Sequence, residues 1–270
     1  MDKECRICKG KSHLYFIKNE LKYFKCTDCG FIFLIEDKYT YDTNYNSILD
    51  VHSKNEITYY IKLLNKYIKT PASILDVGCG LGTMKATFES FGYTWHGIDL
   101  VKNNGVIFAD IMTYKNEKQN RYDVILMDNS LEHMLNINGA INKCNELLTD
   151  NGIIILILPN TNSLYAKIFK LNWDKYHIAH VSMFNKKSLT LLMKNNNFKT
   201  LKLTSTPSIS LGLRKLMTKL KFNSVLISFV CYFKREIFYK YINIIYDLFN
   251  LNGNYIIYIG KKENEMEELT

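Results

Sequence analysis

The ten residues ILDVGCGLGT, Ile74–Thr83, decide the fold of this chain. The stretch begins as an apolar run and then places glycine at every second position, at Gly78, Gly80 and Gly82. Glycine adopts backbone conformations that other residues avoid, and without a Cβ it lets the main chain approach a ligand closely. An apolar run followed directly by such a turn predicts a buried β-strand, a tight turn and a helix behind it.

A second short run, His96–Leu100, ends on an acid, Asp99, after the predicted helix. An acid at the tip of the second strand of such a unit can accept the hydroxyls of a ribose. The third glycine comes one residue earlier than in the dinucleotide fingerprint, and Thr83 stands in its place. The turn also lacks the Lys-Ser/Thr pair of a P-loop. The spacing therefore argues against both the dinucleotide fingerprint and the P-loop.

These residues resemble the first motif of the class I S-adenosylmethionine (SAM) methyltransferases. The resemblance implies an α/β, Rossmann-like sheet of about seven mostly parallel strands, closed by an antiparallel final strand. In that family the turn holds the amino-acid end of SAM. The residues to which the resemblance gives a cofactor-binding role here are Asp76, Gly78, Gly80, Gly82, Asp99 and Leu100.

The resemblance continues downstream in the same order. Val106–Asp110 is predicted to be a third strand, and Asp110 would then contact the adenine amino group. Tyr122–Met127 is an apolar run typical of a strand buried on both faces. The residues that follow it, Asn129 and Ser130, would lie beside the sulfonium.

Glu132 and His133 are expected to begin the next helix, where an acid suits the helix dipole. His133 is a second candidate base. A fifth strand over 153–158 and a terminal strand over 255–260 complete the predicted sheet. The resemblance covers roughly 48–198 and this last strand.

Asn172–Asn185 resembles the family's Trp…His…Phe segment, which overhangs the acceptor. His180 matches the family's histidine, and a hydroxyl acceptor needs such a base. Trp173 and Phe184 would form an apolar wall, and His177 could share a helical face with His180. Two histidines in a surface loop are the alternative interpretation. A paired-histidine metal site is conceivable, but the sequence offers no convincing carboxylate partner.

Ala179 bears on which atom of the acceptor is methylated. Sugar carbon-methyltransferases with a similar amino-terminal ribbon carry Glu directly before the histidine. The alanine in this chain therefore favours oxygen over carbon as the acceptor.

Two cysteine pairs, Cys5-x-x-Cys8 and Cys26-x-x-Cys29, are separated by seventeen residues. This is the spacing of a four-thiolate zinc site, which is closed and structural. A redox function is the alternative, but one pair would suffice for it. Such a ribbon ahead of a methyltransferase domain resembles two groups, bacterial enzymes that methylate sugars and small metabolites, and ribosomal-RNA base methyltransferases.

The 270 residues suit one large domain, or one domain and a small module. The net charge of +9 invites a nucleic-acid interpretation, but the lysines are spread singly, as on solvated faces. An amino end without an apolar core indicates a cytoplasmic location. The predicted parts are a zinc ribbon (1–36), a linker with a cap helix near 53–69 (37–72), a SAM-binding core (73–205), a helical insertion and final strand (206–262) and an acidic tail (263–270).

The carboxy-terminal stretch 206–250 is apolar and basic, and its longest uncharged run is too short to span a bilayer. It could cap the substrate site, form an oligomer surface or contact the inner membrane face peripherally. The function favoured by the sequence is SAM-dependent methyl transfer to a hydroxyl of a sugar or other small metabolite. An RNA base methyltransferase and a non-catalytic SAM-binding or scaffold protein are the alternatives. The oligomeric state stays open.

Overall fold

A computed structural model describes residues 2–18, 20–35, 54–116, 121–176, 179–206 and 252–263. Three predicted features lie outside these residues: most of the linker, the helical insertion over 207–250 and the acidic tail beyond Glu263. His177 is also outside them. Within the described part of the chain, no helix has the length and hydropathy needed to cross a membrane.

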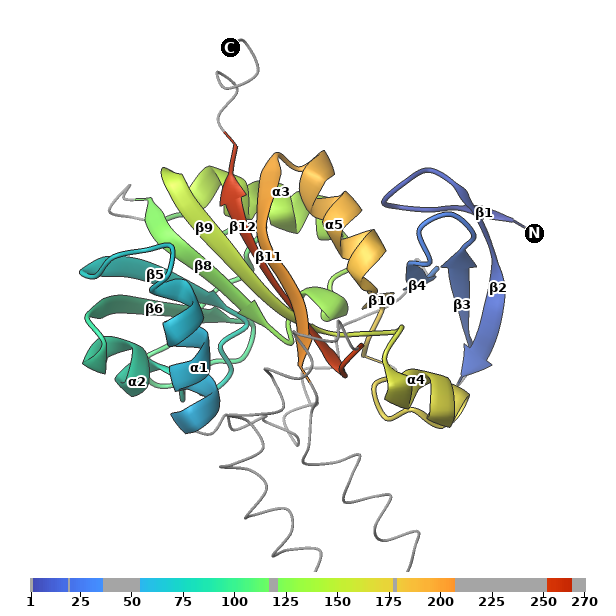
Figure 1. Cartoon of the computed structure of the whole chain (residues 1–270), viewed down its shortest axis with the longest axis horizontal. Coiled ribbons are helices and arrows are strands. Elements are labelled where there is room, and N and C mark those ends of the chain that lie inside the picture. The colour runs from blue at the N-terminus through green and yellow to red at the C-terminus, as the bar shows by residue number, and fades with distance from the viewer. Residues whose placement is uncertain are drawn as a thin grey trace, which may run out of the picture.

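The main sheet has seven strands in the order β11-β12-β9-β8-β5-β6-β7 (Figure 1). The five strands from β5 to β9 pair in parallel, whereas β12 runs antiparallel to both β9 and β11. This arrangement confirms the predicted fold class, including the antiparallel closing strand. The strands are β5 (Ala72–Val77), β6 (Tyr93–Asp99), β7 (Ile107–Phe108), β8 (Tyr122–Asp128), β9 (Leu148–Pro159), β11 (Phe198–Thr206) and β12 (Tyr255–Lys262).

Helices cover both faces of this sheet, which explains its continuous apolar strands. Helices α1 (Lys54–Leu64) and α2 (Lys85–Ser90) pack on one face, and α3 (Ile137–Leu147) and α5 (Lys186–Asn195) on the other. Side chains of a strand alternate between the faces. In β8, Leu126 therefore packs with α1 and α2, whereas its neighbour Met127 packs with α3.

Several predicted boundaries differ from the structure; for example, β9 begins at Leu148 instead of residue 153, and β12 extends to Lys262 instead of residue 260. Helix α1 ends at Leu64, five residues earlier than expected, and the third strand shortens to Ile107–Phe108 at the exposed sheet edge. Glu132 and His133 do not open α3; they lie in a separate 3₁₀ turn, η1 (Leu131–His133). The reason is that Asn136 caps α3, because its side chain accepts a hydrogen bond from Gly139 N at 3.0 Å.

The amino-terminal module is a small sheet in the order β1-β2-β3-β4-β10. The first four strands are β1 (Lys3–Glu4), β2 (Lys11–Lys18), β3 (Leu21–Cys26) and β4 (Ile32–Leu34). The fifth, β10 (Ser182–Met183), belongs to the main domain and pairs antiparallel with β4. Strands β3 and β4 form a hairpin around the second cysteine pair. A strand of the main domain thus completes the amino-terminal sheet.

The two faces formed by β3 and β4 are largely buried, so this part of the module shares its core with the rest of the chain. Phe24 and Phe33 join the cluster that contains α3 and α5. The alternate side chains Tyr23 and Ile32 pack with Trp173. That tryptophan follows helix α4 (Leu164–Phe169) and the 3₁₀ turn η2 (Lys170–Asn172).

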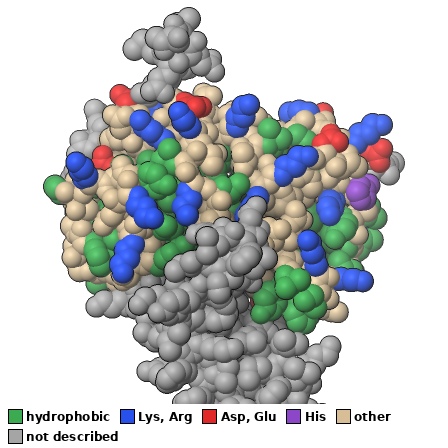
Figure 2. All heavy atoms as spheres, viewed as in Figure 1, with side chains coloured by type: hydrophobic (Ala, Val, Ile, Leu, Met, Phe, Trp, Pro, Cys, Tyr) green, Lys and Arg blue, Asp and Glu red, His purple; other side chains and the backbone are tan. Residues whose placement is uncertain are grey.

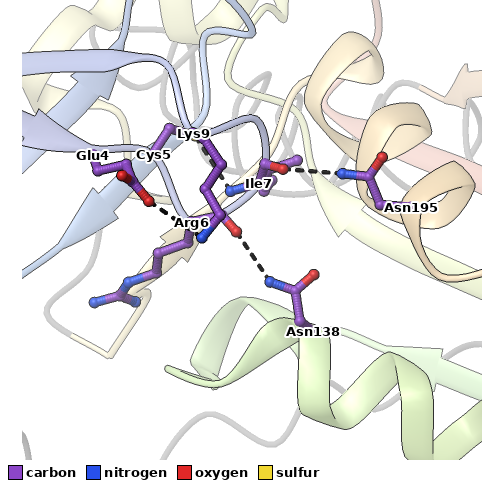
Figure 3. A network of polar contacts seen from close by, with 7 residues as sticks. All are labelled: Glu4, Cys5, Arg6, Ile7, Lys9, Asn138 and Asn195. Atoms are coloured by element: carbon purple, nitrogen blue, oxygen red, sulfur yellow. Dashed lines mark hydrogen bonds and ion pairs between the residues drawn. The ribbon is translucent and has the colours of Figure 1, made fainter.

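The first cysteine loop is fixed to the helices of the main domain by amide side chains (Figure 3). Asn138 of α3 donates to Arg6 O, and Asn195 of α5 donates to Ile7 O, each at 3.0 Å. The Arg6 guanidinium donates in turn to Leu34 O at 2.6 Å and to Leu135 O at 3.2 Å. The module is therefore anchored through its backbone as well as its apolar faces.

Candidate cofactor and acceptor site

The glycine turn at the carboxyl end of β5 adopts the left-handed conformations predicted for it. The φ angles of Gly78, Gly80 and Gly82 are 76°, 57° and 67°. A Cβ on Gly78 would lie 2.6 Å from the Cβ of Ser130, in the chain that leaves β8. The turn is therefore pressed against the carboxyl end of the neighbouring strand, and glycine is required there.

Asp99, at the end of β6, holds this turn in place. Its two carboxylate oxygens accept hydrogen bonds from Gly80 N and Val101 N, both at 2.8 Å. Asn103 Nδ2 donates to Gly80 O at 3.1 Å from the same side. A carboxylate has about four acceptor positions, so the half-buried Asp99 retains capacity for ligand hydroxyls.

Asp76 lies beneath the turn and is 3% exposed. Burial, reinforced by the nearby charge of Asp128, raises the pKa of Asp76 to about 8. Trp95 Nε1 donates to Asp76 Oδ2 at 3.3 Å and opposes that rise. Burial thus favours the protonated form of Asp76, and its predicted contact with the cofactor stays a prediction.

Trp95 is a residue of this site that the sequence interpretation missed. Its indole ring occupies the space above Gly97, where a Cβ would lie 2.1 Å from the ring. A Cβ added to Gly82 would likewise lie 3.2 Å from the Trp95 ring. The signal was present in the sequence, because a glycine two residues after a tryptophan on a strand leaves room for the ring on the same face.

Leu100 and Asp110 both lie near the carboxyl ends of β6 and β7. Both side chains are exposed. The Asp110 carboxylate accepts a hydrogen bond from Met112 N at 2.9 Å and so stabilises its own turn. Their predicted contacts with the adenosine part of SAM stay predictions.

Asn129 and Ser130 follow β8 directly and lie beside the glycine turn. Asn129 has a left-handed φ of 51°, and its Nδ2 donates to Asp128 Oδ1 at 2.8 Å. Ser130 Oγ is buried and has no hydrogen-bond partner among the described residues. Gly78, which the Ser130 side chain contacts, is exposed. A polar group of a ligand bound there could therefore form a hydrogen bond with the Ser130 hydroxyl.

His133 and His180 are brought together although they lie 47 positions apart in the chain. Their ring centroids are 4.8 Å apart and the rings are 76° to each other. His133 Nδ1 lies 2.9 Å from Ala179 O, and His180 Nδ1 lies 2.7 Å from Lys175 O. Because a carbonyl oxygen only accepts, each Nδ1 carries the proton and each Nε2 carries the lone pair.

The small sheet holds the segment that carries His180. Leu34 N of β4 donates to Val181 O, and Val181 N donates to Glu132 O, both at 2.9 Å. Ser182 Oγ donates to Met134 O at 2.7 Å. One ladder of hydrogen bonds thus runs from the amino-terminal module through the His180 segment to the η1 turn.

The two aromatic residues predicted to wall the acceptor are both buried. Trp173 is 1% exposed and packs edge-on against Tyr176, with ring centroids 5.1 Å apart. Phe184 packs against Phe31 of the amino-terminal module at 5.1 Å. Residues of the amino-terminal module supply apolar partners for both rings, and the contact of Trp173 and Phe184 with an acceptor stays a prediction. His177, the other predicted substrate residue, is outside the described residues.

The four amino-terminal cysteines converge on one point. Their sulfur atoms all lie within 4.8 Å of one another, with Cys5 and Cys29 at 3.6 Å and Cys8 and Cys26 at 3.3 Å. A tetrahedral zinc ion with Zn–S bonds of about 2.3 Å requires sulfur separations of roughly 3.8 Å. Main-chain Ile7 N also donates to Cys5 Sγ. The geometry fits a single zinc ion.

Comparison with known families agrees with this arrangement. Residues 51–203, more than half of the chain, match the model of a family described as a methyltransferase domain. The chain belongs to this methyltransferase family. The match contains the glycine turn, Asp99 and both histidines.

Two curated relatives of this methyltransferase each align with about a third of the chain. A ubiquinone biosynthesis O-methyltransferase of Rhodopseudomonas palustris is 24% identical over 33% of this chain and 40% of its own length. An (S)-coclaurine N-methyltransferase of Papaver somniferum is 30% identical over 33% of this chain and 30% of its own length. The chain therefore spans less than half the length of the curated relatives it matches.

A solved methyltransferase has the same fold at low sequence identity. The Burkholderia thailandensis 1,6-didemethyltoxoflavin-N1-methyltransferase, with its methyl acceptor and S-adenosylhomocysteine bound, aligns with a TM-score of 0.53 and 12% identity. The alignment covers 93% of this chain and 100% of the other. At this identity the likeness shows the fold alone.

Gly78→Ala is expected to weaken SAM binding by this methyltransferase at least tenfold, or about 1.4 kcal/mol. The new Cβ both strains a positive φ and collides with Ser130, so the turn must move. Gly105→Ala is the matched control, because Gly105 has the same φ of 76° with nothing within 4 Å of an added Cβ. Calorimetric titration of both variants checks the prediction. Equal affinities would show that the contact with Ser130 is unimportant.

Proposed function

We propose that this methyltransferase transfers the methyl group of SAM to a hydroxyl of a small, sugar-like molecule. One observation carries the proposal. The glycine turn with Asp99 and the pair of histidines lie at the same carboxyl edge of the parallel sheet, joined through the short segment from Asn129 to His133. Ligands of open α/β sheets bind at this edge.

SAM is the methyl donor that fits the turn. Asp99 would accept the ribose hydroxyls, and the main chain of the exposed Gly78 and the half-buried Gly80 would approach the amino-acid end. The buried Ser130 hydroxyl would gain the partner that the described residues do not give it. S-adenosylhomocysteine in the Burkholderia structure supports this assignment.

His180 would act as the base at the acceptor, with His133 beside it. Its Nε2 lone pair takes the hydroxyl proton while the oxygen forms a bond to the methyl carbon. The bond between that carbon and the sulfonium sulfur breaks, and S-adenosylhomocysteine leaves. Ala179 in place of a glutamate favours oxygen as the acceptor atom. The relatives named for O- and N-methylation of small molecules support an acceptor of that size.

The four cysteines would hold a structural zinc ion. Zinc would then join the loop before β2 to the loop after β3. Because β4 pairs with β10, the ion would also help to hold the segment that carries His180. The ribbon is in this view a support for the acceptor side of the site.

An acceptor panel tests the proposed function. The zinc-loaded protein is incubated with methyl-labelled SAM and separately with nucleotide sugars, phenolic metabolites and RNA. We expect label in a hydroxyl-bearing small molecule and not in RNA, since Lys and Arg are dispersed singly over the surface seen in Figure 2. Label in an RNA base, lost steeply with salt, would replace the proposal with the RNA alternative.

A further inference from the structure

We propose that Glu132, His133 and His180 form a second metal site, which binds a divalent transition-metal ion. One ligand atom from each of these three residues lies within 4.8 Å of the others. Bound at about 2.1 Å from one ion, the atoms would stand roughly 3.4 Å apart. Small side-chain rotations close that difference.

The anchoring of the two rings is the second observation. Metal-binding histidines almost always donate their other ring N–H to a carbonyl or carboxylate, which fixes the ring for the ion. His133 and His180 both do so, to Ala179 O and Lys175 O. In the neutral ring this leaves Nε2 as the nitrogen that would hold the ion.

Glu132 supplies the carboxylate that the sequence did not reveal as a partner. Its side chain is 1% exposed, and its backbone oxygen is held by Val181 N at 2.9 Å. Burial of an ionised carboxylate is costly, and a bound cation offsets that cost. The hydrogen bond to Val181 also ties the backbone of Glu132 to the segment that carries His180.

The ligand set selects the class of ion. Two imidazoles and one carboxylate favour zinc, iron, cobalt or manganese over magnesium and calcium, which prefer oxygen ligands throughout. Three protein ligands leave a coordination position open for water or substrate, as in catalytic zinc sites. This site differs in kind from the four-thiolate cluster, which is closed.

The consequence for the acceptor rests on the proposed function. A hydroxyl oxygen in the open position would lose its proton to a water molecule more readily, because the ion stabilises the oxyanion. With the ion bound, the Nε2 of His180 holds the metal, and the ion takes over the activation that the imidazole would otherwise provide.

Cobalt titration tests the site without any assay of activity. The cysteine cluster is first filled with zinc, and Co²⁺ is then added while the visible spectrum is recorded. We expect one further equivalent to bind with the weak d–d bands of nitrogen and oxygen ligands and without thiolate charge-transfer bands. Glu132→Gln and His180→Ala should each weaken this binding roughly 100-fold. Glu89→Gln and His13→Ala, which alter exposed residues elsewhere, should leave it unchanged.

Two results would overturn the proposal. One is the absence of a second cobalt ion in the wild-type protein up to millimolar cobalt, a result that no variant's folding can affect. The other is a second ion that Glu132→Gln and His180→Ala retain. SAM titration of the same samples keeps the two proposals apart, because a protein that binds cobalt here but no SAM would refute only the proposed function.

Discussion

Removing the zinc ion proposed for the four cysteines is expected to unfold the amino-terminal module and to abolish most methyl transfer. Structural zinc in small modules contributes on the order of 10 kcal/mol to folding. The module has no independent core, because Phe24 and Tyr23 pack into two different clusters that it shares with the main domain. Its strand β4 holds Val181, next to His180. Loss of the module would therefore release the acceptor side of the site while the glycine turn stays folded.

Cys26→Ser measures this effect, with Cys144→Ala as its control. Cys144 is a buried thiol of α3 outside the four-cysteine cluster. We expect the Cys26 variant to lose its thiolate-bound zinc, to be cleaved rapidly by protease within its first 35 residues, and to bind SAM nearly normally. The control should keep its zinc. A Cys26 variant with intact zinc or a protease-resistant amino terminus would contradict the structural role of the site.

His180→Ala is expected to lower kcat by about 10²- to 10⁴-fold, the usual contribution of a positioned base. We expect the same loss of kcat if His180 Nε2 binds the metal ion of the proposed second site. The base role and the metal-ligand role both require the lone pair of Nε2. SAM affinity should change by less than about threefold, or 0.7 kcal/mol, since the glycine turn and Asp99 are untouched.

His13→Ala is the control for this prediction, because it removes an exposed imidazole from β2. Single-turnover methyl transfer at saturating SAM separates the chemical step from cofactor binding. A His180 variant with the wild-type rate would show that the histidine pair is not part of the acceptor site.

The sheet was predictable because its signals are local. The apolar composition of a run such as Tyr122–Met127 is enough to predict a buried strand. The turn at Gly78 has a positive φ, which glycine adopts readily. The spacing of the two cysteine pairs is likewise enough to predict a shared zinc site. These features need no knowledge of which distant residues meet.

The acceptor side was less predictable because it is assembled from distant segments. Trp173 was expected to face substrate, but Tyr23 and Ile32, about 150 positions earlier, bury it. Glu132 was expected to begin a helix, but Asn136 starts α3 later and leaves Glu132 in a 3₁₀ turn beside His180. Periodicity within one segment gives no information on such long-range contacts.

The most direct test of the central claim is calorimetric titration with SAM and S-adenosylhomocysteine. The account predicts micromolar binding by the zinc-loaded wild-type protein. Asp99→Ala should weaken it by about 3 kcal/mol, or roughly 100-fold, because two ribose hydroxyls lose a charged acceptor. Asp150→Ala, which removes an exposed carboxylate paired with Arg121, should bind normally. Absence of binding by either ligand, or equal binding by Asp99→Ala, would contradict the account.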